Sequence, residues 1–240
     1  MVIFPIRIII LSTLFFSSSL FSQQKPKYSE RYPKNYSNGI LWINQNYQTA
    51  DSIIKGFGLE TKIVLAIGFP ECTRYSETSD FFETGSNNYL YVTFGSTYSN
   101  FSSGRFQMKP SFVEKLEQFI LSDKSKSIFH PYFLYENSKD EKSKRRKRLA
   151  RLESTRWQII YLSAFFSYLE GKYNQKKWSN IDEKIDFFAT AYNRGFWLDE
   201  SEILKWKTIS FFPTGKSDST NNYPYGIVAL EFFNNFKFKY

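Results

Sequence analysis

Apolar residues recur at steps of three and four along residues 157–169, and this period constrains the fold of the chain more than any other feature. The side chains that share it would lie on one face of a helix: Trp157, Ile160, Tyr161, Ala164, Phe165, Tyr168 and Leu169. Three other segments are expected to be helical: residues 59–69, ending near Pro70, the residues after Pro110, and residues 181–194. The sequence therefore predicts a mostly α fold.

Residues with capping chemistry mark the ends of two of these helices. Ser111 and Glu114 have the spacing of a capping box, Asn180 precedes the last helix, and Gly195 would stop it in a left-handed conformation. Between residues 78 and 101 the helical period fails and turn-forming residues accumulate. We expect a minor β or irregular insertion there.

The amino terminus has the pattern of an export signal. Arg7 precedes an apolar run over residues 8–16, and serines follow at a plausible cleavage zone. The run is shorter than the roughly 20 residues that span a bilayer. We expect a signal peptide over residues 1–22, a polar leader without a core of its own over residues 23–39, and one domain over residues 40–240. The location would be the periplasm or cell envelope.

The chain has one cysteine, Cys72, and one histidine, His130. A cysteine-built zinc site and a multi-histidine site are both excluded by this count, and no cofactor is expected. A thiol enzyme built on these two residues would lack a recognisable orienting partner and a motif around either residue.

The formal net charge of +9 favours an anionic partner. The expected export of the chain counts against nucleic acid as this partner, whereas the peptide stems of the cell wall carry free carboxylates and would suit it. Five consecutive basic residues are interpreted as the solvated start of the helix at residues 157–169 or as a peripheral contact with an anionic envelope surface: Lys144, Arg145, Arg146, Lys147 and Arg148.

Four segments combine into a pattern that carries chemistry. In order they read IVLAIGFPE (63–71), SGRFQMKPS (103–111), FFATAYNRG (187–195) and NNYPYGIVALEFF (221–233). Over residues 59–235 the sequence resembles the soluble lytic transglycosylases of the lysozyme-like superfamily, whose members carry a helix-terminal glutamate, G-x-x-Q-x-x-P-S/T, A-A-Y-N-x-G and a late tyrosine. The matching residues are Glu71; Gly104, Gln107, Pro110 and Ser111; Ala191, Tyr192, Asn193 and Gly195; and Tyr223.

Two departures from the family pattern concern the start of the site. Cys72 stands where the family usually has serine, and Glu71 and Gln107 are farther apart than in a typical member. Residues 74–101 would then be an insertion beside the cleft, in which Tyr89–Val92 could form a short strand. The resemblance implies a lysozyme-like α+β fold that binds peptidoglycan glycan strands.

Glycoside cleavage needs a proton for the leaving oxygen, which a carboxyl supplies only when it stays protonated near neutral pH. Glu71 follows an apolar run, and an apolar pocket would raise its pKa. The resemblance implies that Glu71 acts first as acid and then as base, closing an anhydro-muramic ring without water. It assigns the substrate contacts to Gln107, Met108 (a groove or a core residue), Tyr192, which would donate to Glu71, Asn193 and Ser103.

Several alternatives stay open from the sequence. A lysozyme-type hydrolase would need a second carboxylate, for which the insertion offers Glu77, Asp80 and Glu83. A non-catalytic peptidoglycan binder or an accessory protein of an envelope machine would retain the same fold.

Overall fold

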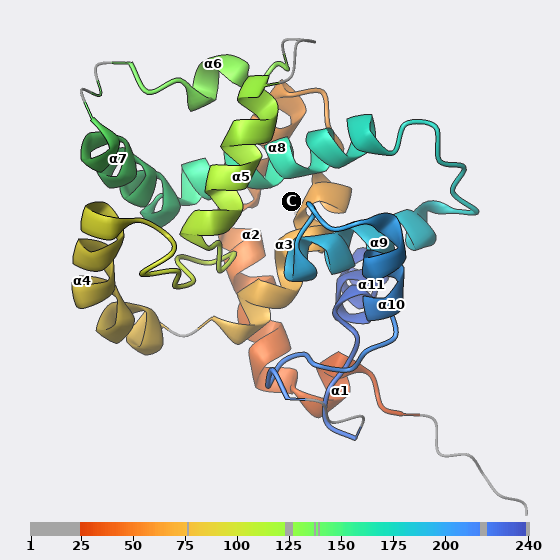
Figure 1. Ribbon diagram of the computed structural model, residues 1–240. Coiled ribbons are helices and arrows are strands. Elements are labelled where there is room, and N and C mark those ends of the chain that lie inside the picture. Colours follow the sequence, from red (N-terminus) through yellow and green to blue (C-terminus); the bar gives the residue numbers. More distant parts are fainter. Residues whose placement is uncertain are drawn as a thin grey trace, which may run out of the picture.

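The computed structural model describes residues 25–75, 77–122, 127–136, 138, 140–216 and 220–238, and of residues 77–84 only the backbone. The proposed signal peptide lies outside these residues. Within them the chain is mostly helical and contains only isolated β-bridges, without a strand (Figure 1). None of the helices in these ranges combines the length and the apolar character needed to cross a membrane.

Eleven helices are formed by the described residues. They are α1 (Tyr28–Arg31), α2 (Pro33–Gly56), α3 (Thr61–Arg74), α4 (Glu77–Phe94), α5 (Pro110–Ser122), α6 (His130–Phe133), α7 (Glu141–Glu153), α8 (Thr155–Lys172), α9 (Ile181–Arg194), α10 (Glu200–Trp206) and α11 (Tyr225–Asn235).

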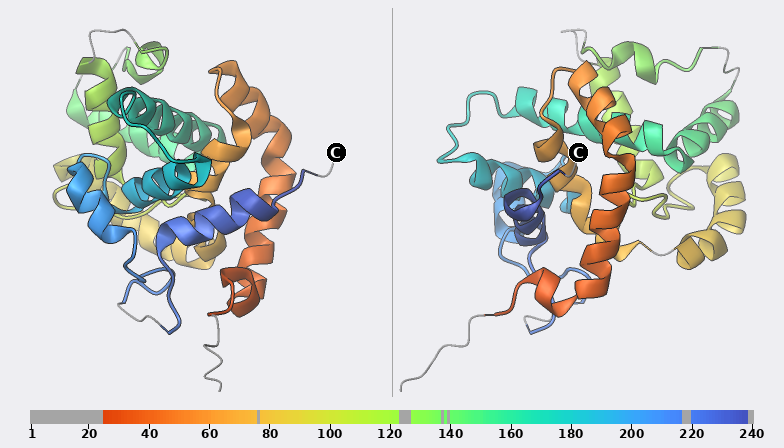
Figure 2. Two further views of the ribbon diagram at one scale, coloured as in Figure 1. Left: turned by 90° about the vertical axis from the view of Figure 1, so that its right-hand side faces the viewer. Right: turned by 180° about the vertical axis from the view of Figure 1, so that it is seen from behind.

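Helix α3 lies at the centre and packs against α2, α8, α9 and α11 (Figures 1 and 2). Of its 14 residues only Lys62 and Arg74 are not buried, because the helix is apolar on all sides and must be covered on all sides. Phe69 of α3 stacks on Phe232 of α11, with ring centroids 4.2 Å apart. This central position carries the end of α3 into the interior, where Glu71 lies in its last turn.

A tight loop over residues 103–108 rests on α3. Gly68 permits the approach, since a Cβ there would come within 2.7 Å of the Phe106 ring. Ser103 and Met108 exchange both backbone hydrogen bonds at 3.0 Å, which closes the loop. Gly104 has a φ of +65° and leaves no room for a side chain beside Gln158. The loop is therefore held rigidly against the end of α3.

The predicted helices at α5, α8 and α9 are confirmed, while two details at helix ends are wrong. Helix α3 continues through Pro70 to Arg74 instead of ending at the proline. The amino terminus of α5 is capped by Asn100, whose Oδ1 accepts from the Ser111 amide at 3.0 Å, and not by a local capping box. Glu114 instead accepts hydrogen bonds from neighbouring helices, such as that of Tyr91 at 2.8 Å.

The expectation that residues 23–39 form a polar leader without a core of its own is wrong for the part that the structure describes. Tyr28 of α1 is fully buried and its hydroxyl bonds to Thr73 Oγ1 at 2.8 Å. The carboxylate of Glu231 in α11 accepts from the backbone amides of Tyr28 and Ser29. This segment is polar in composition, but the few aromatic residues within it pack against the domain.

The insertion expected to be β or irregular is the helix α4 over most of its length. Tyr91, in the segment expected to be a strand, is a fully buried helical residue that packs with Phe101 and Leu149. The apolar residues of this segment gather at 81–82 and 89–92 around turn-forming residues and do not follow the helical period, and α4 packs mainly against α7.

The basic run over residues 144–148 belongs to a separate helix, α7, and is not all available to a surface. Arg148 is buried and pairs with Glu117 at 2.7 Å and with Glu114 at 3.2 Å. Arg145 donates to the carbonyls at the end of α4 at 3.4 Å. Arg146 and Lys147 are the exposed members of the run, so the suggested envelope contact is reduced to part of this helix.

Candidate active site

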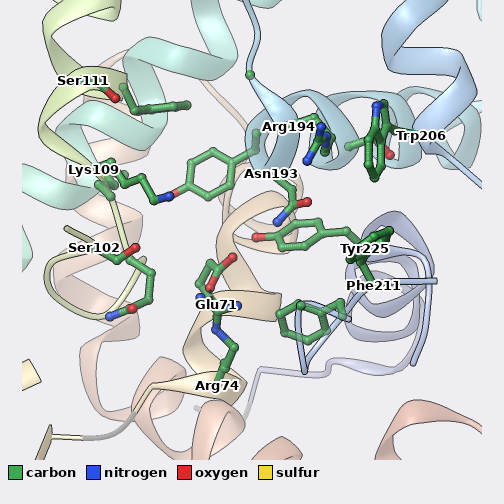
Figure 3. A pocket seen from close by; sticks show the side chains of 18 of the residues that line it. Glu71, Arg74, Ser102, Lys109, Ser111, Asn193, Arg194, Trp206, Phe211 and Tyr225 are labelled. Carbon is green, nitrogen blue, oxygen red and sulfur yellow. Dashed lines mark ion pairs between the residues drawn. The ribbon is translucent and has the colours of Figure 1, made fainter. Parts of the chain in front are cut away.

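A pocket of about 490 Å³ opens over the end of α3 (Figure 3). Residues 100–112, from the loop and the start of α5, line one side. Residues 190–197 at the end of α9, residues 206–215 and Tyr225 at the start of α11 line the other side. The segments that resemble the transglycosylases thus meet around one cavity, with Glu71 beneath it.

Glu71 is buried, with 6% of its surface exposed, and it faces the pocket. Burial raises the pKa of its carboxyl because the ionised form loses its hydration. The guanidinium of Arg74, one turn further on, opposes this effect, with its Nε 3.5 Å from Glu71 Oε2. The ammonium of Lys109 also lowers the pKa of Glu71 from across the pocket. The net direction is upward, as a catalytic acid requires.

Two neutral donors face the same carboxyl. The hydroxyl of Tyr225 and the amide of Asn193 both point toward Glu71 (Figure 3), and both lower its pKa by hydrogen bonding to the charged form. The contacts are loose, because Glu71 Oε2 and the Tyr225 hydroxyl oxygen, though buried, lack full hydrogen-bond geometry. Catalytic hydrogen bonds are often long in this way before substrate binds.

The expectation that Tyr192 donates to Glu71 is wrong. The Tyr192 hydroxyl donates to the carbonyl of Phe106 at 2.7 Å, so it ties α9 to the loop over residues 103–108. The late tyrosine is also misplaced, since Tyr223 donates to the Pro26 carbonyl at 2.6 Å and does not line the pocket. Tyr225, two positions further on, takes the place beside Glu71.

The other residues expected to contact substrate divide into two groups. Gln107, Met108, Tyr192 and Asn193 line the pocket. Met108 is only 2% exposed, so it is both a core residue and part of the pocket wall. Ser103 is buried in the loop away from the pocket, and its neighbour Ser102 lines the wall instead.

Some pocket residues had no role in the sequence interpretation although two of them lie inside the motifs. Lys109 precedes the motif proline, and Arg194 occupies the variable position of A-Y-N-x-G. The guanidinium of Arg194 lies 3.3 Å from the centroid of the Trp206 ring. Nothing in the sequence marks Trp206 or Phe211 as part of the site, because Trp206 ends α10 and Phe211 lies in the loop after it, outside the motifs.

A thiol enzyme is not supported by this arrangement. Cys72 is buried behind Glu71, burial raises the pKa of its thiol, and the thiol faces Arg105. Neither Cys72 nor His130 lines the pocket, and His130 lies on α6. Across the described residues no group of three or more metal-ligating side chains comes together. The side chains of the candidate second carboxylates, Glu77, Asp80 and Glu83, lie outside the described part.

The comparisons with known proteins give no relative for this chain. No family model matches it, and no match was found among the curated proteins or among the solved structures.

Proposed function

We propose that this chain is an exported, lysozyme-like enzyme of the cell envelope that cleaves peptidoglycan glycan strands by lytic transglycosylation. The observation that carries the proposal is Glu71. Among the described residues it is the one carboxyl that lines the pocket, and burial raises its pKa. A single acid of this kind, at the bottom of a cavity large enough for sugar rings, suits a reaction that needs one group for both proton transfers.

The reaction would use Glu71 twice. Its carboxyl gives a proton to the glycosidic oxygen as the bond from that oxygen to the anomeric carbon breaks. The 6-hydroxyl of the same muramic residue then attacks the anomeric carbon and returns its proton to the Glu71 carboxylate. The product is an anhydro-muramic end, and no water is consumed.

The surroundings of Glu71 suit both halves of this cycle. Burial favours the protonated form that begins the reaction. Once the proton has left, the Tyr225 hydroxyl and the Asn193 amide can donate to the carboxylate, and Arg74 and Lys109 offset its charge. These interactions stabilise the ionised form enough for it to persist until it acts as a base.

Transglycosylation is favoured over hydrolysis by the composition of the pocket. An inverting or retaining hydrolase places a second carboxylate roughly 5 to 9.5 Å from the acid. The described side chains around the pocket supply cations, amides, hydroxyls and aromatic rings instead. The polar groups near Glu71 are therefore suited to holding a sugar and its acetamido group, with Asn193 and Gln107 as candidates.

A non-catalytic binder is the second candidate, and the ion pair between Arg74 and Glu71 favours it. A carboxylate held by arginine in the resting protein would bind hydroxyls and amides of a glycan without donating a proton. The same pocket would then recognise peptidoglycan on behalf of an envelope assembly.

The decisive experiment incubates the purified protein with sacculi and identifies the released sugar ends by mass spectrometry. Anhydro ends support the proposal, reducing ends indicate a hydrolase, and binding without release indicates the binder. Glu71→Gln should reduce cleavage by about a hundred- to ten-thousandfold or more, because it removes the acid while keeping the shape of the side chain. The variant should stay folded and still sediment with sacculi.

Cys72→Ser is the matched control, because it alters the next residue of the same helix and lies outside the pocket. A serine hydroxyl can face Arg105 as the thiol does. We expect cleavage to persist in Cys72→Ser and to vanish in Glu71→Gln. Equal cleavage by Glu71→Gln and the parent protein would refute the proposal.

A further inference from the structure

The pocket carries more positive charge than the proposed chemistry uses. Arg74, Lys109 and Arg194 line it, against the one carboxyl of Glu71. Arg74 is paired with that carboxyl. Lys109 and Arg194 form no ion pair with any other residue that the structure describes. Cations in a pocket are usually matched by anions, so two unmatched ones suggest that the missing negative charge comes from the ligand.

Arg194 is exposed at the pocket, and an aromatic ring orients its guanidinium. Its guanidinium lies 3.3 Å from the centroid of the Trp206 ring, and Trp206 in turn packs against Phe211 at 5.5 Å between ring centroids. A guanidinium stacked on an aromatic face keeps its N–H groups free at the edge of the plane, where they can donate to both oxygens of a carboxylate. The stack thus orients a bidentate donor at the pocket.

Lys109 reaches the pocket from the opposite side, from the loop that leads into α5 (Figure 3). It lies near enough to Glu71 to lower the pKa of that carboxyl. The two cations therefore lie on the two walls of the cavity, with the proposed catalytic acid beneath them. An anionic group bound by them would lie beside the bond that is cleaved.

We propose that Arg194, assisted by Lys109, binds a carboxylate of the glycan strand, so that the site selects strands with free carboxylates. The identity of the strand rests on the proposed function, whereas the carboxylate chemistry rests on the pocket itself. Two carboxylates of peptidoglycan lie close to the glycosidic bond: those of the stem peptide, and the lactyl group of muramic acid where the stem has been removed.

The test uses the unaltered protein and two kinds of strand: strands with stem peptides, and strands stripped by an amidase so that only the lactyl carboxylate remains. Each kind is compared with the same strands after their carboxylates have been converted to amides. For the kind of strand that carries the bound carboxylate, amidation should raise KM by roughly ten- to a hundredfold, the effect of losing a charged hydrogen bond, with kcat within about twofold. A rise in KM for stem-bearing strands assigns the stem carboxylates, and a rise confined to stripped strands assigns the lactyl group.

Arg194→Gln should raise KM by a similar factor for the kind of strand that amidation affects and leave KM for the amidated form of that strand unchanged, because the interaction is already absent there. Arg156→Gln is the matched control, since it removes an exposed arginine at the start of α8, outside the pocket. Arg194→Lys keeps the charge without the planar fork and should fall between the parent and Arg194→Gln.

The inference is overturned if amidation leaves KM unchanged for both kinds of strand, a measurement that needs no variant and so does not depend on the folding of Arg194→Gln. It is also overturned if Arg194→Gln behaves as Arg156→Gln does. Sedimentation with the same strand preparations separates this inference from the proposed function. Binding that depends on carboxylates and on Arg194, but without cleavage, would refute the proposed function and support the inference.

Discussion

Arg74→Met should extend the activity of the protein to higher pH. The proposed reaction requires the acid form of Glu71, so activity should fall as the pH rises through the pKa of this carboxyl. Burial raises that pKa, and the guanidinium of Arg74 lowers it, with Nε 3.5 Å from Oε2. Removing the guanidinium therefore raises the pKa further, and the alkaline limb of the pH–rate profile moves up.

The size of the effect follows from the geometry of the pair. Two charges 3.5 Å apart interact by about 1 kcal/mol at the dielectric constant of water and by about 5 kcal/mol at an effective constant of 20. The Arg74 side chain is 42% exposed, so solvent screening brings the interaction to about 1–2 kcal/mol. At a fixed pH on the alkaline limb, the ratio of protonated to ionised Glu71 should rise by about five- to thirtyfold.

The assay is the initial rate of release of soluble sugar ends from sacculi between pH 5 and 9. Tyr192, Tyr225 and Cys72 do not obscure the result, because burial raises the pKa of each above its ordinary value and none titrates in this range. Lys62→Met is the control, since it removes the other unburied cation of α3 at the far end of the helix. An alkaline limb that stays in place or moves down in Arg74→Met would refute the assignment of Glu71 as the acid.

Two further changes test the site and its support. Tyr225→Phe removes the donor that faces Glu71 and keeps the buried ring, so the rate of cleavage should fall about five- to a hundredfold with little change in the melting temperature; an unchanged rate would exclude Tyr225 from the site. Arg148→Met removes the closest cation of the buried Glu117 carboxylate, which keeps Arg151 at 3.8 Å, and should lower the free energy of unfolding by about 1.5–3 kcal/mol in urea titrations. Arg146→Met, on the exposed side of the same helix, should change it by less than about 0.5 kcal/mol, and equal losses in the two variants would contradict the buried pair.

Local sequence patterns were sufficient to predict the helices whose apolar residues follow the helical period. Helix α9 begins and ends where its capping asparagine and Gly195 predict, and α8 and α5 lie where their apolar stripes place them. Helix α4 escaped detection because it packs mainly against α7 and its apolar residues do not follow the helical period. Likewise the amino-terminal segment looked like a leader, since one buried tyrosine among polar residues makes no periodic signal.

The resemblance to the transglycosylase motifs was enough to name Glu71, Gln107 and Asn193, and all three line the pocket. Which tyrosine meets that glutamate was decided by tertiary structure. Tyr223 lies in a backbone bridge with Phe212, and Tyr225 is the first residue of α11. Two positions separate them in sequence, yet their side chains leave the backbone in different directions, toward Pro26 and toward the pocket.

For the charged residues, too, the sequence determined their identity and the tertiary structure determined their surroundings. The sequence determined that residues 144–148 are basic and that Lys109 and Arg194 lie inside the motifs. It could not determine that Arg148 is buried against Glu117 while Arg146, two positions earlier, faces solvent, because that depends on which side of α7 meets α5. Nor could it place Trp206 beneath Arg194, since the two residues come from different helices that only packing brings together. Periodicity is a property of one segment, whereas a pocket is formed by segments whose relative positions depend on the whole core.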